Sequence, residues 1–306
     1  MHVAGEPRYF LKLWPDTRVG RATAARLDVY LPLTRALYER GLYPRVSYPI
    51  PTKSGALWAT FSGSPFAVFP FLTGRTPAEW SVALQDEWAR TFAAIHRVTP
   101  ALADVLPPRE VFDIPFESDL RRGLEAIGRI GAREQPGLRA LREMVLPRRE
   151  DIITQLERLH RLQQTVRRLH GPFVLCHTDM GGDNLLVDEH GQLWVLDWDG
   201  ATVAPPEHDL HEARWTDLGR VLEVYWEAGG SYPLHLDHFA FYLLRRHIGD
   251  MAVRLLRILE ENTSAEEDEE LLYGIEAWGF AQWSALDETL ERIAAALHHQ
   301  PRSVLE

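Results

Sequence analysis

The sequence predicts an α+β protein in which short strands gather in two places and long amphipathic helices make up the rest. Short apolar runs bounded by turn residues occur before about residue 72 and again between residues 172 and 200. Elsewhere apolar residues recur at helical spacing over long segments. We therefore expect an α+β fold with two strand-containing segments and a helical remainder.

Composition limits the class of protein. The chain has 306 residues, of which 45% are hydrophobic, as is ordinary for a globular protein with a sizeable core. A single cysteine excludes an internal disulfide and suits a reducing cytoplasm. We see no apolar run of membrane-spanning length and no secretory signal pattern, so we expect no membrane association. The net charge of −11 argues against a nucleic-acid partner and suits a small cationic substrate.

The first expected strand, Tyr9–Trp14, carries a lysine among apolar neighbours. Lys12 is either a charge on an edge strand or the strand lysine that holds nucleotide phosphates. Its acidic partner would lie on the following helix, where Asp28 is the better candidate and Glu39, near the helix end, is the poorer one. Pro32 removes the helix hydrogen bond to the carbonyl of Asp28, so Asp28 can instead lie close to the start of the helix.

A hairpin is expected next, from Leu57–Phe61 and Pro65–Phe69 across a turn at residues 62–64. The chain continues as VFPFLTG. This run is either an edge strand ended by Pro70 or a hinge where an adenine base docks. In the hinge interpretation the Pro70 carbonyl accepts a hydrogen bond and the Leu72 N–H donates one.

Helical periodicity extends over most of the remaining chain. Before residue 172 we expect helices over Trp80–Val98, Phe116–Ile130 and Asp151–His170, with a proline-rich linker over residues 100–115. The two prolines in Ala204–Leu210 predict a loop. The tail then predicts helices over Glu212–Ala228, Leu236–Glu261 and Ala265–Leu297, and Ser264 with Glu267 forms a capping box for the last.

Residues 172–200, PFVLCHTDMGGDNLLVDEHGQLWVLDWDG, are the most informative stretch. Three apolar runs in it predict strands: Phe173–Cys176, Leu185–Val187 and Leu193–Leu196. The last two form a hairpin, which brings Asn184 and Asp197 together because one precedes its first strand and the other follows its second. Asp179 lies on the loop that leads into this hairpin.

This order of Asp, Asn and Asp suits phosphoryl transfer. One carboxylate accepts the proton of the attacking hydroxyl, while an amide oxygen and a second carboxylate hold magnesium on the nucleotide phosphates. Taken singly, Asp179, Asp183 and Asp188 are ordinary turn residues and Asn184 caps a loop. Their order matches the catalytic-loop and magnesium-binding motifs of kinases, which favours a site.

The segment resembles the aminoglycoside phosphotransferase family, which has the protein-kinase fold. FLKLW, VFPFLTG and DWDGA make the chain similar to spectinomycin-type phosphotransferases in particular. The resemblance implies a two-lobe fold, with an N-lobe over residues 1–72 and a C-lobe over residues 73–306. It also implies Mg²⁺ as cofactor and ATP or GTP as co-substrate.

The resemblance implies a role for each residue of the motif. Asp179 is expected to be the catalytic base, and Asn184 and Asp197 the magnesium ligands. The expected nucleotide-binding residues are Lys12, Asp28, Phe69, Pro70 and Leu72. Asp183, Asp199 and Asp250 are expected to contact an amine-bearing acceptor. His177 and Asp209 are expected to support the catalytic loop.

Two other patterns indicate no site. Cys176 precedes His177, but a lone cysteine at the end of an apolar run is expected to be buried and inert. The H-x-x-H pairs at residues 208–211 and 235–238 bring no clear third ligand, so we expect no zinc.

Kinase-like folds place two strands and a phosphate-covering loop before the strand lysine. Here only a turn at Gly5-Glu6-Pro7 and a fragment of one strand fit, so either the true start lies upstream or the loop is depleted. We expect a kinase of an aminoglycoside-like or aminocyclitol-like molecule, acting as a monomer or weak dimer. The alternatives are a kinase of a metabolite such as choline or homoserine, and a catalytically silent binding protein.

Overall fold

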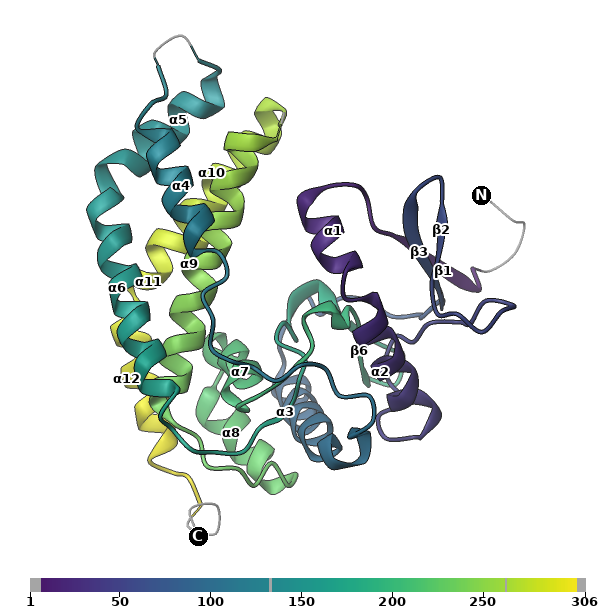
Figure 1. Ribbon diagram of the computed structural model, residues 1–306. Coiled ribbons are helices and arrows are strands. Elements are labelled where there is room, and N and C mark those ends of the chain that lie inside the picture. The colour runs from purple at the N-terminus through teal and green to yellow at the C-terminus, as the bar shows by residue number, and fades with distance from the viewer. Residues whose placement is uncertain (1–6, 132–133, 262, 302–306) are drawn as a thin grey trace. The chain divides into compact units, whose positions relative to one another are not determined.

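The computed structural model describes residues 7–131, 134–261 and 263–301. The chain divides into two compact units (Figure 1). Met1–Glu110, Gly171–Pro233 and His299–Glu306 form the first, and Val111–His170 with Leu234–His298 form the second. These units group residues by their contacts and do not test the lobe boundary expected at residue 72, which stays a prediction.

The first unit begins with an antiparallel sheet of three strands in the order β1-β3-β2. β1 is Tyr9–Leu13, β2 is Ala59–Phe61 and β3 is Ser64–Pro70. The predicted hairpin is confirmed: β2 and β3 are joined at residues 62–63, both of which have positive φ, as the favoured two-residue hairpin turn requires. Because β3 is the central strand, the alternative that residues 65–70 form an edge strand is wrong. Of the turn expected at Gly5-Glu6-Pro7, the first two residues lie outside the described residues.

Two helices connect β1 to β2. α1, Arg18–Ala24, was not expected from the sequence, and Thr17 caps it by accepting a hydrogen bond from the backbone N–H of Gly20. α2 is Leu27–Glu39 with Pro32 inside it. Asp28 lies in the first turn of α2, which agrees with the alternative that placed it near the helix start.

The three strands predicted within residues 172–200 are confirmed as β4 (Val174–Cys176), β5 (Leu185–Val187) and β6 (Leu193–Val195). β5 and β6 form the expected hairpin, and β4 pairs with β7, Thr202–Ala204. Segments from the start of the chain extend the hairpin on both edges. Val46 bridges to Val195 in parallel, and Arg75 bridges to Val187 in antiparallel orientation.

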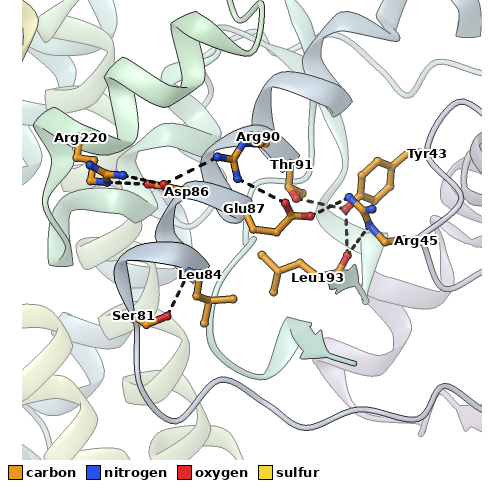
Figure 2. A network of polar contacts seen from close by, with 10 residues as sticks. All are labelled: Tyr43, Arg45, Ser81, Leu84, Asp86, Glu87, Arg90, Thr91, Leu193 and Arg220. Carbon is orange, nitrogen blue, oxygen red and sulfur yellow. Dashed lines mark hydrogen bonds and ion pairs between the residues drawn. The ribbon is translucent and has the colours of Figure 1, made fainter. Parts of the chain in front are cut away.

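Figure 2 shows side chains that hold β6 in place. Arg45 Nε donates to the Leu193 carbonyl at 3.2 Å, and the Tyr43 hydroxyl donates to the same oxygen at 3.2 Å. Arg45 Nη2 also pairs with Glu87 at 3.0 Å, which ties this contact to α3, Val82–Arg97. The strand that ends immediately before Leu196 and Asp197 is therefore fixed from outside the hairpin.

The remaining helices of the first unit are α7 (Glu207–Leu210) and α8 (Leu218–Glu227), with 3₁₀ turns at Thr99–Leu102 and His211–Trp215. α3 contacts α8, β4 and β6. The loop predicted over Ala204–Leu210 is wrong, because Pro206 occupies the N-cap of α7, where a proline interrupts no helix hydrogen bond.

The second unit is helical and is organised around α9, Leu236–Glu260. The others are α4 (Glu117–Ile127), α5 (Pro136–Val145), α6 (Arg149–Val166), α10 (Ala265–Gly274), α11 (Ala281–Ser284) and α12 (Leu286–Leu297). All of them contact α9, with α5 and α11 the least, and Figure 1 shows α6 and α9 side by side. None of the helices in the described residues has the length and hydropathy needed to cross a membrane.

The single helix predicted over Ala265–Leu297 is wrong, although its Ser264–Glu267 capping box is confirmed. The chain stays helical from α10 through a π-helical segment, Ile275–Phe280, into α11, and the break falls at Ala285, between α11 and α12. Within it, a Cβ added to Gly279 would lie 3.2 Å from the Met251 Cβ. Close approach to α9 at a glycine therefore accompanies the π-helical segment.

Candidate active site

A cavity of about 380 Å³ lies in the first unit. It takes its walls from β1, α2, the end of β3 and the β5–β6 hairpin. Its apolar lining is Phe10, Phe69, Pro70, Phe71, Leu72, Leu186, Leu196 and Trp198. Its polar lining is Lys12, Tyr30, Thr34, Ser47, Asp183, Asn184 and Asp197. The cavity thus combines a hydrophobic surface suited to a base with a group of charged and amide side chains.

The loop that carries Asp179 is held by a buried carboxylate. Asp209, on α7, is fully buried and accepts hydrogen bonds from the backbone N–H groups of His177 (3.1 Å) and Thr178 (2.6 Å). His177 Nε2 donates to the Leu196 carbonyl at 2.6 Å, and its Nδ1 accepts from the Asp179 N–H at 3.3 Å. These partners assign the neutral tautomer with the proton on Nε2. His177 and Asp209 therefore make the contacts that a supporting role requires.

Asn184 joins Asp179 to the cavity. Its amide nitrogen donates to the Asp179 carboxylate at 3.0 Å and to the Asp179 carbonyl at 2.9 Å. Because both protons of the amide nitrogen have acceptors, the Asn184 side-chain oxygen is the atom suited to a cation. The backbone carbonyl of Asn184 accepts from the Leu196 N–H at 2.8 Å, which fixes the start of the hairpin to its end.

Asp197 faces the strand lysine. Lys12 Nζ lies 2.6 Å from Asp197 Oδ1, and both side chains line the cavity. Asp197 has φ +51°, a left-handed conformation that is uncommon for a residue other than glycine and that is often found at functional sites. An amide oxygen at Asn184 and a carboxylate at Asp197 are hard oxygen donors of the kind that Mg²⁺ prefers, so the residues fit this metal.

Asp199 lies beside this group. Burial and the charge of Asp197 raise the pKa of the Asp199 carboxyl, and the charge of Lys12 opposes that shift. Thr23, at the end of α1, donates to Asp199 at 3.2 Å. Two carboxylates and one lysine thus share a region where a bound cation would be stabilised.

The expected pairing of Lys12 with an acid on α2 is wrong in this structure. Asp28 accepts from the indole N–H of Trp58 at 2.7 Å, and Glu39 pairs with Arg35. Asp28 does not line the cavity. Asp28 is hydrogen-bonded to Trp58, on the segment before β2, and the carboxylate next to Lys12 is that of Asp197.

The hinge residues Phe69, Pro70 and Leu72 all line the cavity. The Phe71 N–H donates to the Arg8 carbonyl at 3.0 Å, and Arg75 pairs with Val187 of β5 through both backbone groups. Within the described residues the Leu72 N–H has no backbone acceptor. A backbone N–H that donates to a bound base must be available in this way. The adenine-docking role stays a prediction.

The expected acceptor-binding acids lie in different places. Asp183 lines the cavity and Asp199 lies beside Asp197. Asp250 lies on α9 in the second unit, where Arg246 Nε donates to its carboxylate at 3.0 Å. Its acceptor role stays a prediction.

Cys176 is fully buried, and burial raises the pKa of its thiol, as expected for an inert cysteine. It lies close to His96 and Asp209, and one ligand atom from each of the three falls within 4.8 Å of the others. His96 is already bonded, by Nδ1 to the Tyr225 hydroxyl at 2.8 Å and by Nε2 to Asp209 at 3.1 Å. A hydrogen-bond network accounts for this cluster without a metal.

Three polar residues of the cavity were not predicted: Tyr30, Thr34 and Ser47. Tyr30 and Thr34 are four residues apart on one face of α2. Polar groups on an otherwise apolar helix face were the signal that sequence reasoning passed over.

Comparisons with known proteins agree with this geometry. A family model described as the phosphotransferase enzyme family matches residues 2–243. Protein StrN of Streptomyces griseus is 28% identical over 228 residues, which cover 72% of this chain and 67% of StrN. The crystal structure of spectinomycin phosphotransferase APH(9)-Ia with ADP and spectinomycin is similar with a TM-score of 0.70 at 18% identity, over 94% of this chain and 85% of that one.

A choline/ethanolamine kinase family protein from Mesorhizobium loti is also similar, with a TM-score of 0.55 at 15% identity, over 96% of this chain and 87% of that one. At such identities the likeness concerns the fold. The expected α+β, protein-kinase-like fold is confirmed.

Proposed function

The chain belongs to the phosphotransferase enzyme family, and on that basis we propose that it transfers the γ-phosphoryl group of ATP or GTP to a hydroxyl of a small cationic acceptor. The acceptor class we propose is an aminocyclitol or aminoglycoside. The observation that carries the proposal is one cavity that contains Lys12, Asn184 and Asp197, with Asp179 hydrogen-bonded to Asn184.

The nucleotide would bind with its base against the hinge and its phosphates near Lys12. Phe10, Phe69 and Leu72, which line the cavity, would supply apolar contacts, and the Leu72 N–H would supply a donor. Lys12 lies beside Asp197, so its ammonium would meet phosphates whose magnesium is bound by that carboxylate. Bound magnesium would neutralise charge on the phosphates, with Asn184 and Asp197 as its protein ligands.

Asp179 would accept the proton of the attacking hydroxyl. Its backbone N–H is held by His177 and its carboxylate by the amide of Asn184. A general base contributes about 10²–10⁴-fold to the rate. Holding the carboxylate next to a magnesium ligand would place the acceptor hydroxyl close to the γ-phosphoryl group, which is the main requirement of this chemistry.

Charge supports the proposed acceptor class. The net charge is −11, and Asp183 and Asp199 lie at or beside the cavity. APH(9)-Ia was crystallised with spectinomycin, which supports an aminocyclitol as the first acceptor to test. The fold likeness to a choline/ethanolamine kinase family protein makes an amino alcohol the second candidate.

An acceptor panel tests the proposal. Spectinomycin, kanamycin, choline and homoserine would each be incubated with Mg·ATP or Mg·GTP, with ADP or GDP release and product mass as readouts. We expect phosphorylation of an aminocyclitol or aminoglycoside by the wild type. In Asp197→Ala we expect the magnesium-dependent transfer to be abolished. Transfer to choline alone would favour a metabolite kinase. If neither nucleotide raised the melting temperature, a kinase function of any kind would be contradicted.

A further inference from the structure

Tyr30, on α2, has a hydroxyl group that has no role in the mechanism proposed above. The residue is 3% exposed and lines the cavity. Among the described residues its hydroxyl oxygen has no hydrogen-bond partner. Buried polar groups in folded proteins are almost always hydrogen-bonded, so an unpaired one on a cavity wall indicates a partner that binds in the cavity.

The surroundings define what this hydroxyl does. Burial raises the pKa of Tyr30 well above its ordinary value, and the charges of Asp199 and Asp197 raise it further. The hydroxyl therefore stays protonated and acts as a donor. Tyr30 lines the same cavity as Lys12, Asn184 and Asp197, which carry the charged and amide groups of that cavity.

Thr34 is the other polar side chain that α2 contributes to the cavity. Its hydroxyl already donates to the Leu31 carbonyl at 3.1 Å. The Tyr30 hydroxyl is thus the donor that α2 has available in the described residues, and no acid of α2 reaches Lys12.

We propose that the Tyr30 hydroxyl donates a hydrogen bond to a phosphate oxygen of the bound nucleotide. This inference rests on the proposed function, because it assumes that a nucleotide occupies the cavity. α2 then contributes to phosphate binding directly through a tyrosine, in place of an acid that would hold the lysine.

The test is Tyr30→Phe, which removes the hydroxyl and keeps the ring. Affinities for Mg·ADP, AMP and adenosine would be measured by calorimetry. Because a hydrogen bond to a charged group is lost, we expect binding of Mg·ADP to weaken about tenfold, which corresponds to about 1.4 kcal/mol. Adenosine, which has no phosphate, should bind as it does to the wild type.

The melting temperature of the ligand-free variant separates a binding role from a structural one. Tyr30→Phe should melt no lower than the wild type, because the deleted hydroxyl has no protein partner. Tyr43→Phe is the matched control. The Tyr43 hydroxyl is bonded to Leu193 and Thr91 (Figure 2) and Tyr43 does not line the cavity, so this variant should melt lower and keep the ratio of ADP to adenosine affinity.

Equal Mg·ADP affinity in Tyr30→Phe and the wild type would overturn the inference and leave the proposed function standing. An equal loss for ADP and adenosine would also overturn it, because the partner would then be the nucleoside. A lower melting temperature of ligand-free Tyr30→Phe would show a structural hydroxyl instead. A wild type that binds no nucleotide would refute the proposed function itself.

Discussion

Substitution of Asp209 by asparagine tests how the catalytic loop is held. The Asp209 carboxylate is fully buried and accepts three hydrogen bonds, two from the backbone of His177 and Thr178 and one from His96. Asparagine keeps one acceptor oxygen and turns an NH₂ group toward a donor. At least one N–H of this set then loses its acceptor.

The cost follows from those contacts. Losing a hydrogen bond to a charged acceptor and leaving a buried N–H unpaired should lower the free energy of unfolding by about 2–4 kcal/mol. That is a large share of the roughly 5–15 kcal/mol by which most proteins are stable. Movement of the loop by about 1 Å would also misplace Asp179, which we expect to lower kcat about 100-fold. KM for the nucleotide should change little, because Asp209 does not line the cavity.

Urea unfolding and steady-state kinetics measure both effects. Asp86→Asn is the control, because the Asp86 carboxylate also accepts hydrogen bonds, from the Arg220 guanidinium of α8 at 2.7 Å (Figure 2), but in a partly exposed pair. A surface pair contributes about 0–1 kcal/mol, so this variant should keep both stability and turnover close to wild type. If Asp209→Asn had the same free energy of unfolding and the same kcat as the wild type, the idea that Asp209 holds the loop would be refuted.

Three further predictions concern single side chains. Lys12→Met should weaken Mg·ATP binding at least about tenfold by calorimetry, because the phosphates lose a charge-assisted hydrogen bond; unchanged affinity would exclude Lys12 from phosphate binding. Asp199→Asn should stabilise the ligand-free protein at neutral pH, because a raised folded-state pKa means that the wild type loses stability as pH rises above the unfolded value of about 3.9. Urea unfolding across pH should show a gain at pH 7 that shrinks toward pH 4, and a gain independent of pH would contradict this explanation. Cys176 should resist iodoacetamide at pH 8 in the folded protein and react after denaturation, because burial raises the pKa of its thiol; rapid labelling of the native protein would show that it is accessible.

The sequence predicted the parts of the site that depend on local pattern. Alternation of apolar runs and turn residues located β4, β5 and β6, and the hairpin then required Asn184 and Asp197 to be neighbours. The Ser264–Glu267 capping box is likewise a local signal. Such features depend on few residues that are close in the chain, so they are readable without the fold.

Contacts between distant segments were not predictable in the same way. The partner of Lys12 is 185 residues away at Asp197, whereas the expected partner, Asp28, is bonded to Trp58. Which donor is nearest depends on how α2 packs, and no local pattern records that. The unpaired hydroxyl of Tyr30 is a property of the same packing.

The secondary-structure prediction was wrong where the same local pattern is compatible with two structures. The prolines after β7 predict a loop, but a proline at the N-cap is compatible with a helix, and α7 begins directly after Pro206. The tail pattern was periodic enough for one long helix. It is interrupted only at Ala285, and no apolar–polar pattern marks that residue.

The central claim is that Asp179 accepts the proton of an acceptor hydroxyl beside a magnesium-bound nucleotide. The most direct measurement is single-turnover transfer of a labelled γ-phosphoryl group by wild type and Asp179→Asn, both saturated with Mg·ATP and an acceptor that the wild type uses. We predict that the variant binds Mg·ATP with wild-type affinity and transfers the phosphoryl group about 10²–10⁴-fold more slowly. Transfer at the wild-type rate would contradict the account.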